Sequence, residues 1–319
     1  MAIATNTFTR FDAIGVREQL SNVIYNVAPT ETPFLSNAKV GKAKNTLFEW
    51  QEDTLAAAVS SNQQLEGDDL TSYTAVVATV RLGNYVEIAR KDVVISETQE
   101  AVDSAGRSSE MGYQIAKLGK ELKRDMETSL LANKAAAAGN TTTARDTGTF
   151  CGFVKTNIDK ASDGTAPVYT SIPTDVWTNG TTRAFTETIT KAVLKLCYDN
   201  GANVSTIMLG SFNKQAFSAF SGVVELMANQ GRAQATIIGA ANTYVSDFGT
   251  LSVVPNRFAL NRNAYFIDWE QVQVNYLRPF QASELAKTGD AKKRLLVVEY
   301  GLQVNAQKGL GLATDLTTS

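Results

Sequence analysis

The chain has 319 residues with 30 basic and 32 acidic side chains, so its formal net charge is −2 and its isoelectric point is about 5.5. This length is enough to bury one or two hydrophobic cores, and the charge balance excludes the strongly cationic surface of a dedicated nucleic-acid-binding protein. The sequence contains no histidine, which removes the usual general base, metal ligand and partner of a nucleophilic serine or cysteine.

The first 45 residues show no sustained periodicity. A short helical pattern covers residues 17–25, a turn follows between Pro29 and Pro33, and three lysines follow between residues 39 and 44. Structureless segments of this length are uncommon inside compact domains, yet this one is too apolar for a disordered tail. We therefore expect an extended arm that lies along protein surface, either its own or that of a neighbour.

Two strands with alternating apolar residues are predicted next, at Thr46–Leu55 and Ser72–Ala89. Their connection is polar, is far longer than an ordinary hairpin turn, and ends in an acidic tip of Glu66, Asp68 and Asp69. A long hairpin that projects from a core exposes unpaired strand edges. We expect another chain or element to cover them.

A long amphipathic helix is predicted over about residues 107–138, because apolar residues recur there at intervals of three or four. Ser96 and Gln99 have the spacing of a capping box that opens this helical region. The polar face is rich in charges, and Lys117 and Glu121 are placed to form an ion pair. We interpret this face as solvated.

The segment from Gly139 to about Thr182 is rich in turn-forming residues and indicates a domain boundary. A helix from Phe185 to Leu196 should end at Asn200-Gly201, followed by a buried strand at Val204–Leu209. Ser211 is expected to cap a short helix that extends to Phe220. Two short strands around the turn at residues 247–249 complete a small α/β unit.

Three further strands are predicted at Ala264–Trp269, Val272–Leu277 and Arg294–Asn305. They are expected to form a mostly antiparallel sheet beside the long helix. The predicted fold class is therefore α+β.

Nothing in the sequence indicates catalysis, a cofactor or a metal. Phosphate-binding, nucleophile-elbow and calcium-loop motifs are absent, and three carboxylates on one loop are too few for a dedicated cation site. Cys151 and Cys197 lie among apolar residues, which predicts two buried thiols of raised pKa. No signal peptide or membrane-spanning segment is expected.

Two blocks of sequence resemble the major capsid (major head) proteins of tailed bacteriophages: DAIGVREQLSNVIYNVAPTETPF at Asp12–Phe34 and FEWQEDTL at Phe48–Leu55. The resemblance implies the Hong Kong 97-like capsid fold. It assigns an N-terminal arm to residues 1–45, an extended hairpin loop to 46–90, and an axial domain to 182–250. Residues 91–181 and 251–319 would form the peripheral domain, with its long spine helix at about 107–138 and its final sheet at about 251–308.

The resemblance also implies function and partners. The chain would assemble with copies of itself, as pentamers and hexamers, into an icosahedral shell around double-stranded DNA that it contacts non-specifically on its inner face. The chain would be located in the virion after assembly in the bacterial cytoplasm. It would have no membrane partner. Because the arm begins within a few residues of Met1, a separate scaffolding protein is expected, besides a portal and an optional decoration protein. Ala56–Leu70 contains no lysine, so no covalent crosslink through the loop is expected.

The residues expected to contact neighbouring subunits are Arg17, Tyr25, Phe34, Phe48, Trp50, Glu66, Asp68 and Asp69. Phe48 and Trp50 fit the chain's own core equally well. Two other functions stay open: a cellular nanocompartment shell of the same fold, and an enzyme that uses Cys151 or Cys197 with carboxylates. The second would need a thiol of lowered pKa, which the apolar neighbours of both cysteines oppose.

Overall fold

A computed structural model of the whole chain describes residues 31–69, 73–102, 108–220 and 242–318. Its elements, in chain order, are α1 (Pro33–Asn37), β1 (Lys39–Lys42), β2 (Leu47–Glu52), β3 (Val80–Tyr85), β4 (Glu87–Ser96), α2 (Glu97–Ala101), α3 (Glu110–Leu131), α4 (Phe150–Phe153), β5 (Ile158–Asp159), α5 (Glu187–Asp199), β6 (Thr206–Leu209), α6 (Ser211–Ser218), β7 (Thr243–Ser246), β8 (Gly249–Pro255), β9 (Ala264–Ile267), β10 (Val272–Glu284), β11 (Ala291–Val304), the 3₁₀ turn η1 (Gln307–Gly309) and β12 (Gly311–Ala313). Helix and sheet are mixed, as predicted.

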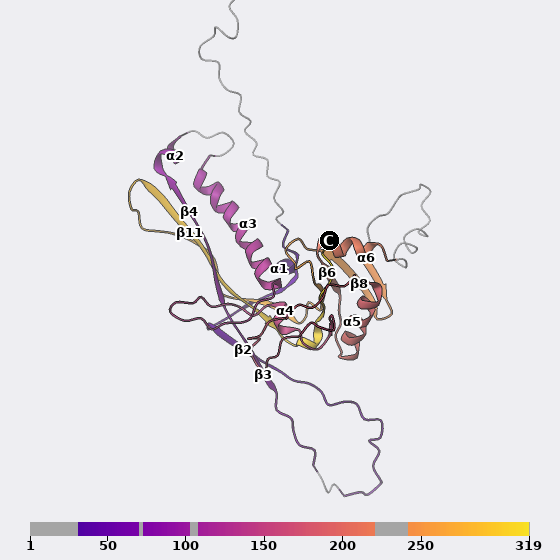
Figure 1. Cartoon of the computed structure of the whole chain (residues 1–319). Helices are drawn as coiled ribbons and strands as arrows, with labels where there is room; N and C mark the ends of the chain where they lie inside the picture. Colours follow the sequence, from indigo (N-terminus) through magenta and orange to yellow (C-terminus); the bar gives the residue numbers. More distant parts are fainter. Residues whose placement is uncertain (1–30, 70–72, 103–107, 221–241, 319) are drawn as a thin grey trace, which may run out of the picture.

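The first sheet has the strand order β1-β10-β11-β4 and lies against the long helix α3 (Figure 1). β10, β11 and β4 are antiparallel, whereas β1 joins β10 in parallel with Val40 opposite Val274. Every second residue of β11 faces the helix, so Val298 and Leu302 pack with Leu122 and Met126 in one buried core. The predicted antiparallel sheet beside a long helix is confirmed.

The second sheet has six strands in the order β5-β12-β9-β6-β8-β7, with α5 packed against β12 and β5. A separate hydrophobic cluster lies here and includes Val193, Ile207, Phe217 and Phe266. Helix α5 begins with the Thr186 side chain accepting a hydrogen bond from Ile189 N, and it ends before Gly201, whose φ of 81° suits glycine. The predicted helix, its stop and the following strand are confirmed.

Two predicted strands are divided differently in the structure. The run Ser72–Ala89 splits at Val86 into β3, which pairs with β2, and the first part of β4, which pairs with β11. Residues 53–79, apart from the undescribed 70–72, form no strand. The alternation of side chains is the same whether a run pairs in one sheet or in two, so the pattern could not show the division.

The final strands are also shared between sheets. The prediction of a single final sheet over residues 251–308 is wrong, because only β10 and β11 lie in the sheet beside α3, while β8, β9 and β12 lie in the six-stranded sheet. β6 pairs with both β8 and β9, and β12 with β9. Short apolar strands carry no information about which sheet they join.

Helix boundaries show smaller differences from the predictions. The described long helix runs over Glu110–Leu131, and its first turn is capped by Ser109, which accepts from Gly112 N at 3.1 Å. The chain leaves the helix after Leu131 and forms a bridge between Ala137 and Asp146 instead. Gly210, not Ser211, occupies the capping position of α6. The Ser96 cap on Gln99 N and the Lys117–Glu121 pair, at 3.9 Å, are confirmed.

Glu127 of α3 joins the start of α1 to the body of the molecule. Its carboxylate accepts hydrogen bonds from Phe34 N at 2.7 Å and Leu35 N at 2.9 Å, and from Asn256 Nδ2 at 2.7 Å. Burial raises the pKa of Glu127, and these three donors work against that rise. The carboxylate therefore satisfies backbone groups at the helix start that would otherwise be buried without partners.

Asp315 holds the C-terminal segment in a similar way. It has φ of 59°, is buried, and accepts from Gly180 N at 2.7 Å, Ala161 N at 3.2 Å and Arg262 Nη2 at 3.2 Å. The turn-rich segment between residues 139 and 182 is therefore tied to the last strand. This segment packs against the body and does not form a free linker.

The substitution Glu127→Ala should destabilise the folded chain by about 2–4 kcal/mol, because it leaves two backbone donors and the Asn256 amide buried without an acceptor. Glu127→Gln should lower the free energy of unfolding by about half as much as Glu127→Ala, since one acceptor oxygen remains. Denaturant-induced unfolding of the unassembled chain measures both values. The matched control is Glu121→Gln on the same helix, with an expected change within about 0.5 kcal/mol. A loss below about 1 kcal/mol for Glu127→Ala would contradict this role.

Candidate interaction surfaces

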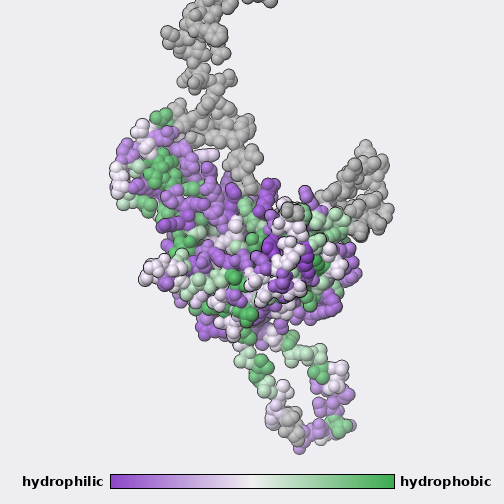
Figure 2. All heavy atoms as spheres, in the orientation of Figure 1, coloured by the Kyte–Doolittle hydropathy of each residue, from purple (hydrophilic) through white to green (hydrophobic). Residues whose placement is uncertain are grey.

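A long loop projects from the body between β2 and β3 (Figure 1). The two strands pair over six residues, from Leu47 opposite Tyr85 to Glu52 opposite Val80. Beyond them, the described residues of the loop are exposed. The side chains of Leu55 and Val76 are 99% and 97% exposed, and hydrophobic residues follow both limbs in Figure 2. This exposed apolar set has no partner within the described chain.

The tip of the loop is acidic. Glu66, Asp68 and Asp69 are exposed, and Leu65 beside them is 82% exposed. A turn forms there, because Asp68 N donates to Leu65 O at 3.2 Å and Gly67 has φ of 79°. The structure therefore presents all three carboxylates at one turn, as the sequence predicts. Their contact with a neighbour stays a prediction.

Aromatic residues anchor the base of the loop to the body. The rings of Phe48 and Trp50 stack at 5.8 Å, and Trp50 lies 5.9 Å from Phe153. Gly301 of β11 leaves room for Phe48, because a Cβ there would lie 2.6 Å from the phenyl ring. Both aromatic side chains are half-buried. Packing within the chain is therefore shown for both, and a further contact with a neighbouring subunit stays a prediction.

The three arm residues have two outcomes. Phe34 is fully buried in its own chain, 6.2 Å from Phe150 and 5.8 Å from Trp269 between ring centres. Its prediction as a contact between subunits is wrong, because no surface remains for a neighbour. Arg17 and Tyr25 lie outside the described residues.

Both cysteines are buried and free. Burial raises the pKa of Cys151 and of Cys197 to about 12 each, so both remain protonated near neutral pH. Asn263 Nδ2 lies 3.3 Å from the Cys151 sulfur, in a fully enclosed site. Neither thiol has the exposure or the lowered pKa of a nucleophile, and the predicted burial is confirmed.

Within the described ranges, no cluster of three or more acidic or cysteine side chains is arranged to hold a metal ion. Likewise, none of the helices among these residues is long and apolar enough to cross a membrane.

Ion-pair networks that join distant parts of the chain were not predicted from the sequence. Glu299 of β11 is nearly buried and pairs with both Arg145 and Arg278. Lys134 pairs with Glu87 at 2.5 Å and with Asp146 at 3.0 Å. Glu127 belongs by its spacing to the charged face that we expect to be solvated. That expectation is wrong for Glu127, because its side chain is fully buried. The partners of the others are distant in sequence.

Comparison with known proteins agrees with this architecture. The family model of the SU10 major capsid protein matches residues 3–317. The major capsid protein of Escherichia phage Phieco32 is 26% identical over 337 residues, covering 93% of this chain and 93% of that protein.

Solved structures with low sequence identity share the fold. The capsid of a native GTA particle has a TM-score of 0.63 at 14% identity and covers 97% of this chain and 98% of its own. The SrpI encapsulin of Synechococcus elongatus has a TM-score of 0.55 at 11% identity and covers 96% and 98%. The Hong Kong 97-like fold is therefore confirmed. The encapsulin shares that fold, whereas the family match and the curated relative both favour a phage capsid over a nanocompartment.

The projecting loop, and the spine helix on its sheet, agree with the family match over residues 3–317. The chain therefore belongs to the SU10 major capsid protein family.

Proposed function

We propose that copies of this chain assemble as pentamers and hexamers into the icosahedral shell of a tailed-phage head, and that the projecting loop forms a main contact between them. The observation that most supports this role is the loop itself. Its side chains Leu55, Val59, Leu65, Tyr73, Val76 and Val77 are 68–99% exposed. Exposed apolar residues over such a length are expected where a neighbour covers them.

The proposal divides the chain into an arm (1–45), an extended loop (46–90), a peripheral domain and an axial domain that begins near residue 182. We place β8, β9 and β12 with the axial unit, because they share its six-stranded sheet. The axial unit then extends past residue 250, and β10 and β11 return to the peripheral sheet.

The proposed partners are a separate scaffolding protein, a portal, a decoration protein and double-stranded DNA held non-specifically on the inner face. Assembly would take place in the bacterial cytoplasm. The near-neutral net charge is consistent with weak, sequence-independent contact with DNA. The role is assembly without catalysis.

Electron microscopy of the purified chain, alone and with its neighbouring gene products, tests the proposal directly. Closed shells, or rings of five and six, are expected. Monomers alone under every condition would contradict it.

The triple variant Leu55→Ser, Val76→Ser and Val77→Ser should weaken assembly without unfolding the subunit. Burial of each aliphatic side chain against a neighbour contributes about 1.5–3 kcal/mol, so the concentration for half-assembly should rise at least about tenfold, as measured by light scattering. Free energies of unfolding should stay within about 0.5 kcal/mol of the parent value. The control, Val168→Ser with Val176→Ser, changes valines that are also exposed but lie off the loop. Unchanged assembly of the triple variant would count against the loop contact.

Shells boiled in dodecyl sulfate should give a single band at 34.4 kDa. The stretch Ala56–Leu70 of the loop has no lysine that could form an isopeptide bond. A ladder of multiples of that mass would show covalent links between subunits.

Iodoacetamide at pH 7.5 should leave Cys151 and Cys197 unmodified in the folded chain. With pKa values of about 12, the reactive thiolate is scarce, and both sulfurs are enclosed. In denaturant, mass spectrometry should find both alkylated. Fast, selective labelling of one thiol in the folded chain would support the cysteine-enzyme alternative instead.

A further inference from the structure

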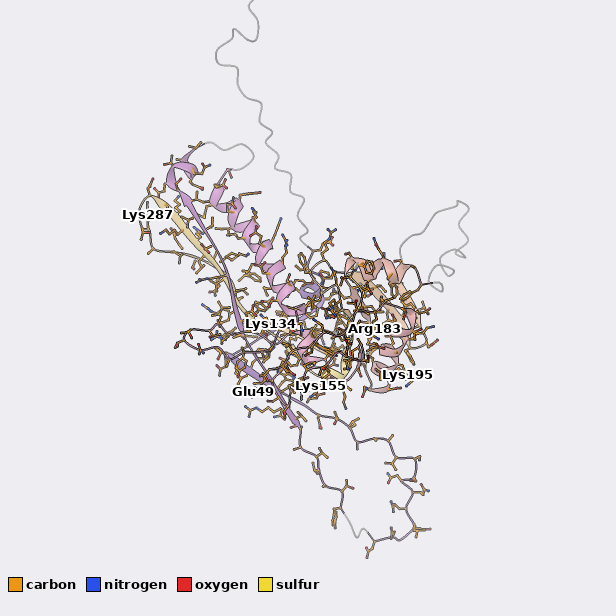
Figure 3. All side chains as sticks on the ribbon, viewed as in Figure 1. Glu49, Lys134, Lys155, Arg183, Lys195 and Lys287 are labelled. Carbon is orange, nitrogen blue, oxygen red and sulfur yellow. The ribbon has the colours of Figure 1, made fainter. Side chains whose placement is uncertain are left out.

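A hollow of about 470 Å³ opens where the end of α5 meets the turn between β7 and β8. Leu194, Cys197 and Leu251 form its floor and are each at most 4% exposed. Helix α5 lies on the side of the body away from α2 (Figure 1), and Lys195 marks this helix in Figure 3. The volume is within the range of pockets that bind small molecules.

Two stacked aromatic side chains line one side of this hollow. The ring centres of Tyr198 and Phe248 are 4.6 Å apart, with 25° between the ring planes. The two side chains are nevertheless 60% and 44% exposed. Tyr73 of the projecting loop is the other exposed aromatic residue in the part of the chain that the structure describes. Aromatic surface is therefore concentrated here outside the core, where a ligand can stack on it.

Two turns hold these rings in place. Helix α5 ends before Gly201, which has φ of 81° and whose N–H donates to Tyr198 O at 2.9 Å. Phe248 N donates to Ser246 Oγ at 3.3 Å, and this hydroxyl donates to Gly249 O at 2.8 Å. A ligand that binds rings already held in position loses less free energy to ordering the site.

Neutral polar groups lie beside the rings. The side-chain amide of Asn203 and the hydroxyl of Tyr198 have no hydrogen-bond partner among the described residues, and both residues are exposed. Together they offer donors and acceptors to a ligand. The lining includes no aspartate, glutamate, lysine or arginine. The hollow thus combines an apolar wall with uncharged hydrogen-bonding groups.

The charged residues next to the lining in sequence interact with one another. Lys195 pairs with Asp199, and Lys191 pairs with Glu187 at 2.9 Å. The hydrogen bond to Glu187 raises the pKa of Lys191, and the charge of Asp247 adds to that rise. A phosphate or carboxylate ligand would find no free cation in the lining. These features favour an uncharged ligand.

We propose that this hollow binds a neutral saccharide, with one face of a sugar ring against Tyr198 and Phe248 and with sugar hydroxyls bonded to Asn203 and to the Tyr198 hydroxyl. A sugar ring has an apolar face of C–H groups and a rim of hydroxyls. An aromatic wall beside neutral donors and acceptors matches both parts. Such binding goes beyond the proposed function, because it is a property of the single chain and does not depend on assembly.

Saturation-transfer NMR of the purified full chain tests the proposal, with maltotriose, lactose and diacetylchitobiose as separate probes. At least one should bind with a Kd of about 0.1–10 mM, as expected for a small ligand in a shallow site. Phe248→Ala should raise that Kd at least about tenfold, because the stacked wall is lost. Asn203→Ala and Tyr198→Phe, which each remove hydrogen-bonding groups, should raise it about threefold.

The matched control is Tyr73→Ala, which removes an exposed aromatic side chain from the projecting loop and should leave the Kd within about twofold of the parent value. Asn203→Ala should also leave the denaturation midpoint unchanged, which separates a binding role from a structural one. The proposal is overturned if none of the three saccharides binds. Binding that persists unchanged in both Phe248→Ala and Asn203→Ala would equally overturn it.

Other occupants would give different results. Adenosine is the probe for a nucleobase, and binding of adenosine without any saccharide would contradict the proposal. If Phe248→Ala prevents assembly while the parent chain binds no saccharide, the hollow is a contact between copies and the proposal fails. A parent chain that binds saccharide but forms no shells would instead support the proposal and contradict only the proposed function.

Discussion

The buried carboxylate of Glu127 is the interaction on which the arrangement of the subunit depends. It accepts hydrogen bonds from the start of α1 and from Asn256, which follows β8. Burying a carboxylate is costly unless it is hydrogen-bonded, and here three donors compensate. The arm, the spine helix and the six-stranded sheet therefore meet at one point. Because α1 is held there, the strand that follows it, β1, can pair with β10.

The projecting loop differs from the body because its exposed apolar side chains lack partners within the described chain. Buried carboxylates of the body such as Asp315 and Glu299 find partners within the chain. The described residues between β2 and β3 beyond the ladder instead leave apolar side chains in water. Exposed apolar surface is unfavourable for an isolated subunit and becomes favourable when a neighbour covers it. The hydrogen bonds and ion pairs of the body fix the shape of the subunit before assembly. The exposed apolar side chains of the loop gain their contacts only when subunits assemble.

The features predicted correctly from the sequence are those that depend on nearby residues. The periodicity of α3 and the cap at Ser96 involve neighbours three or four positions apart. Features that depend on distant residues were missed. Phe34 was assigned to a contact between subunits because nothing near it shows Glu127, 93 residues later. The division of Ser72–Ala89 between two sheets has the same cause, since alternation does not identify the partner strand.

A nearly neutral chain can still carry a local charged patch that orients its contacts. A net charge of −2 imposes little mutual repulsion between copies. Some charges of the body are closed into pairs, such as Lys134 with Glu87, and these cannot attract a neighbour. The three carboxylates at the loop tip are instead exposed. Charged groups contribute orientation and specificity to a contact more than raw affinity. In the proposed assembly, the apolar side chains of the loop supply the attraction, and its acidic tip contributes to the orientation of the contact.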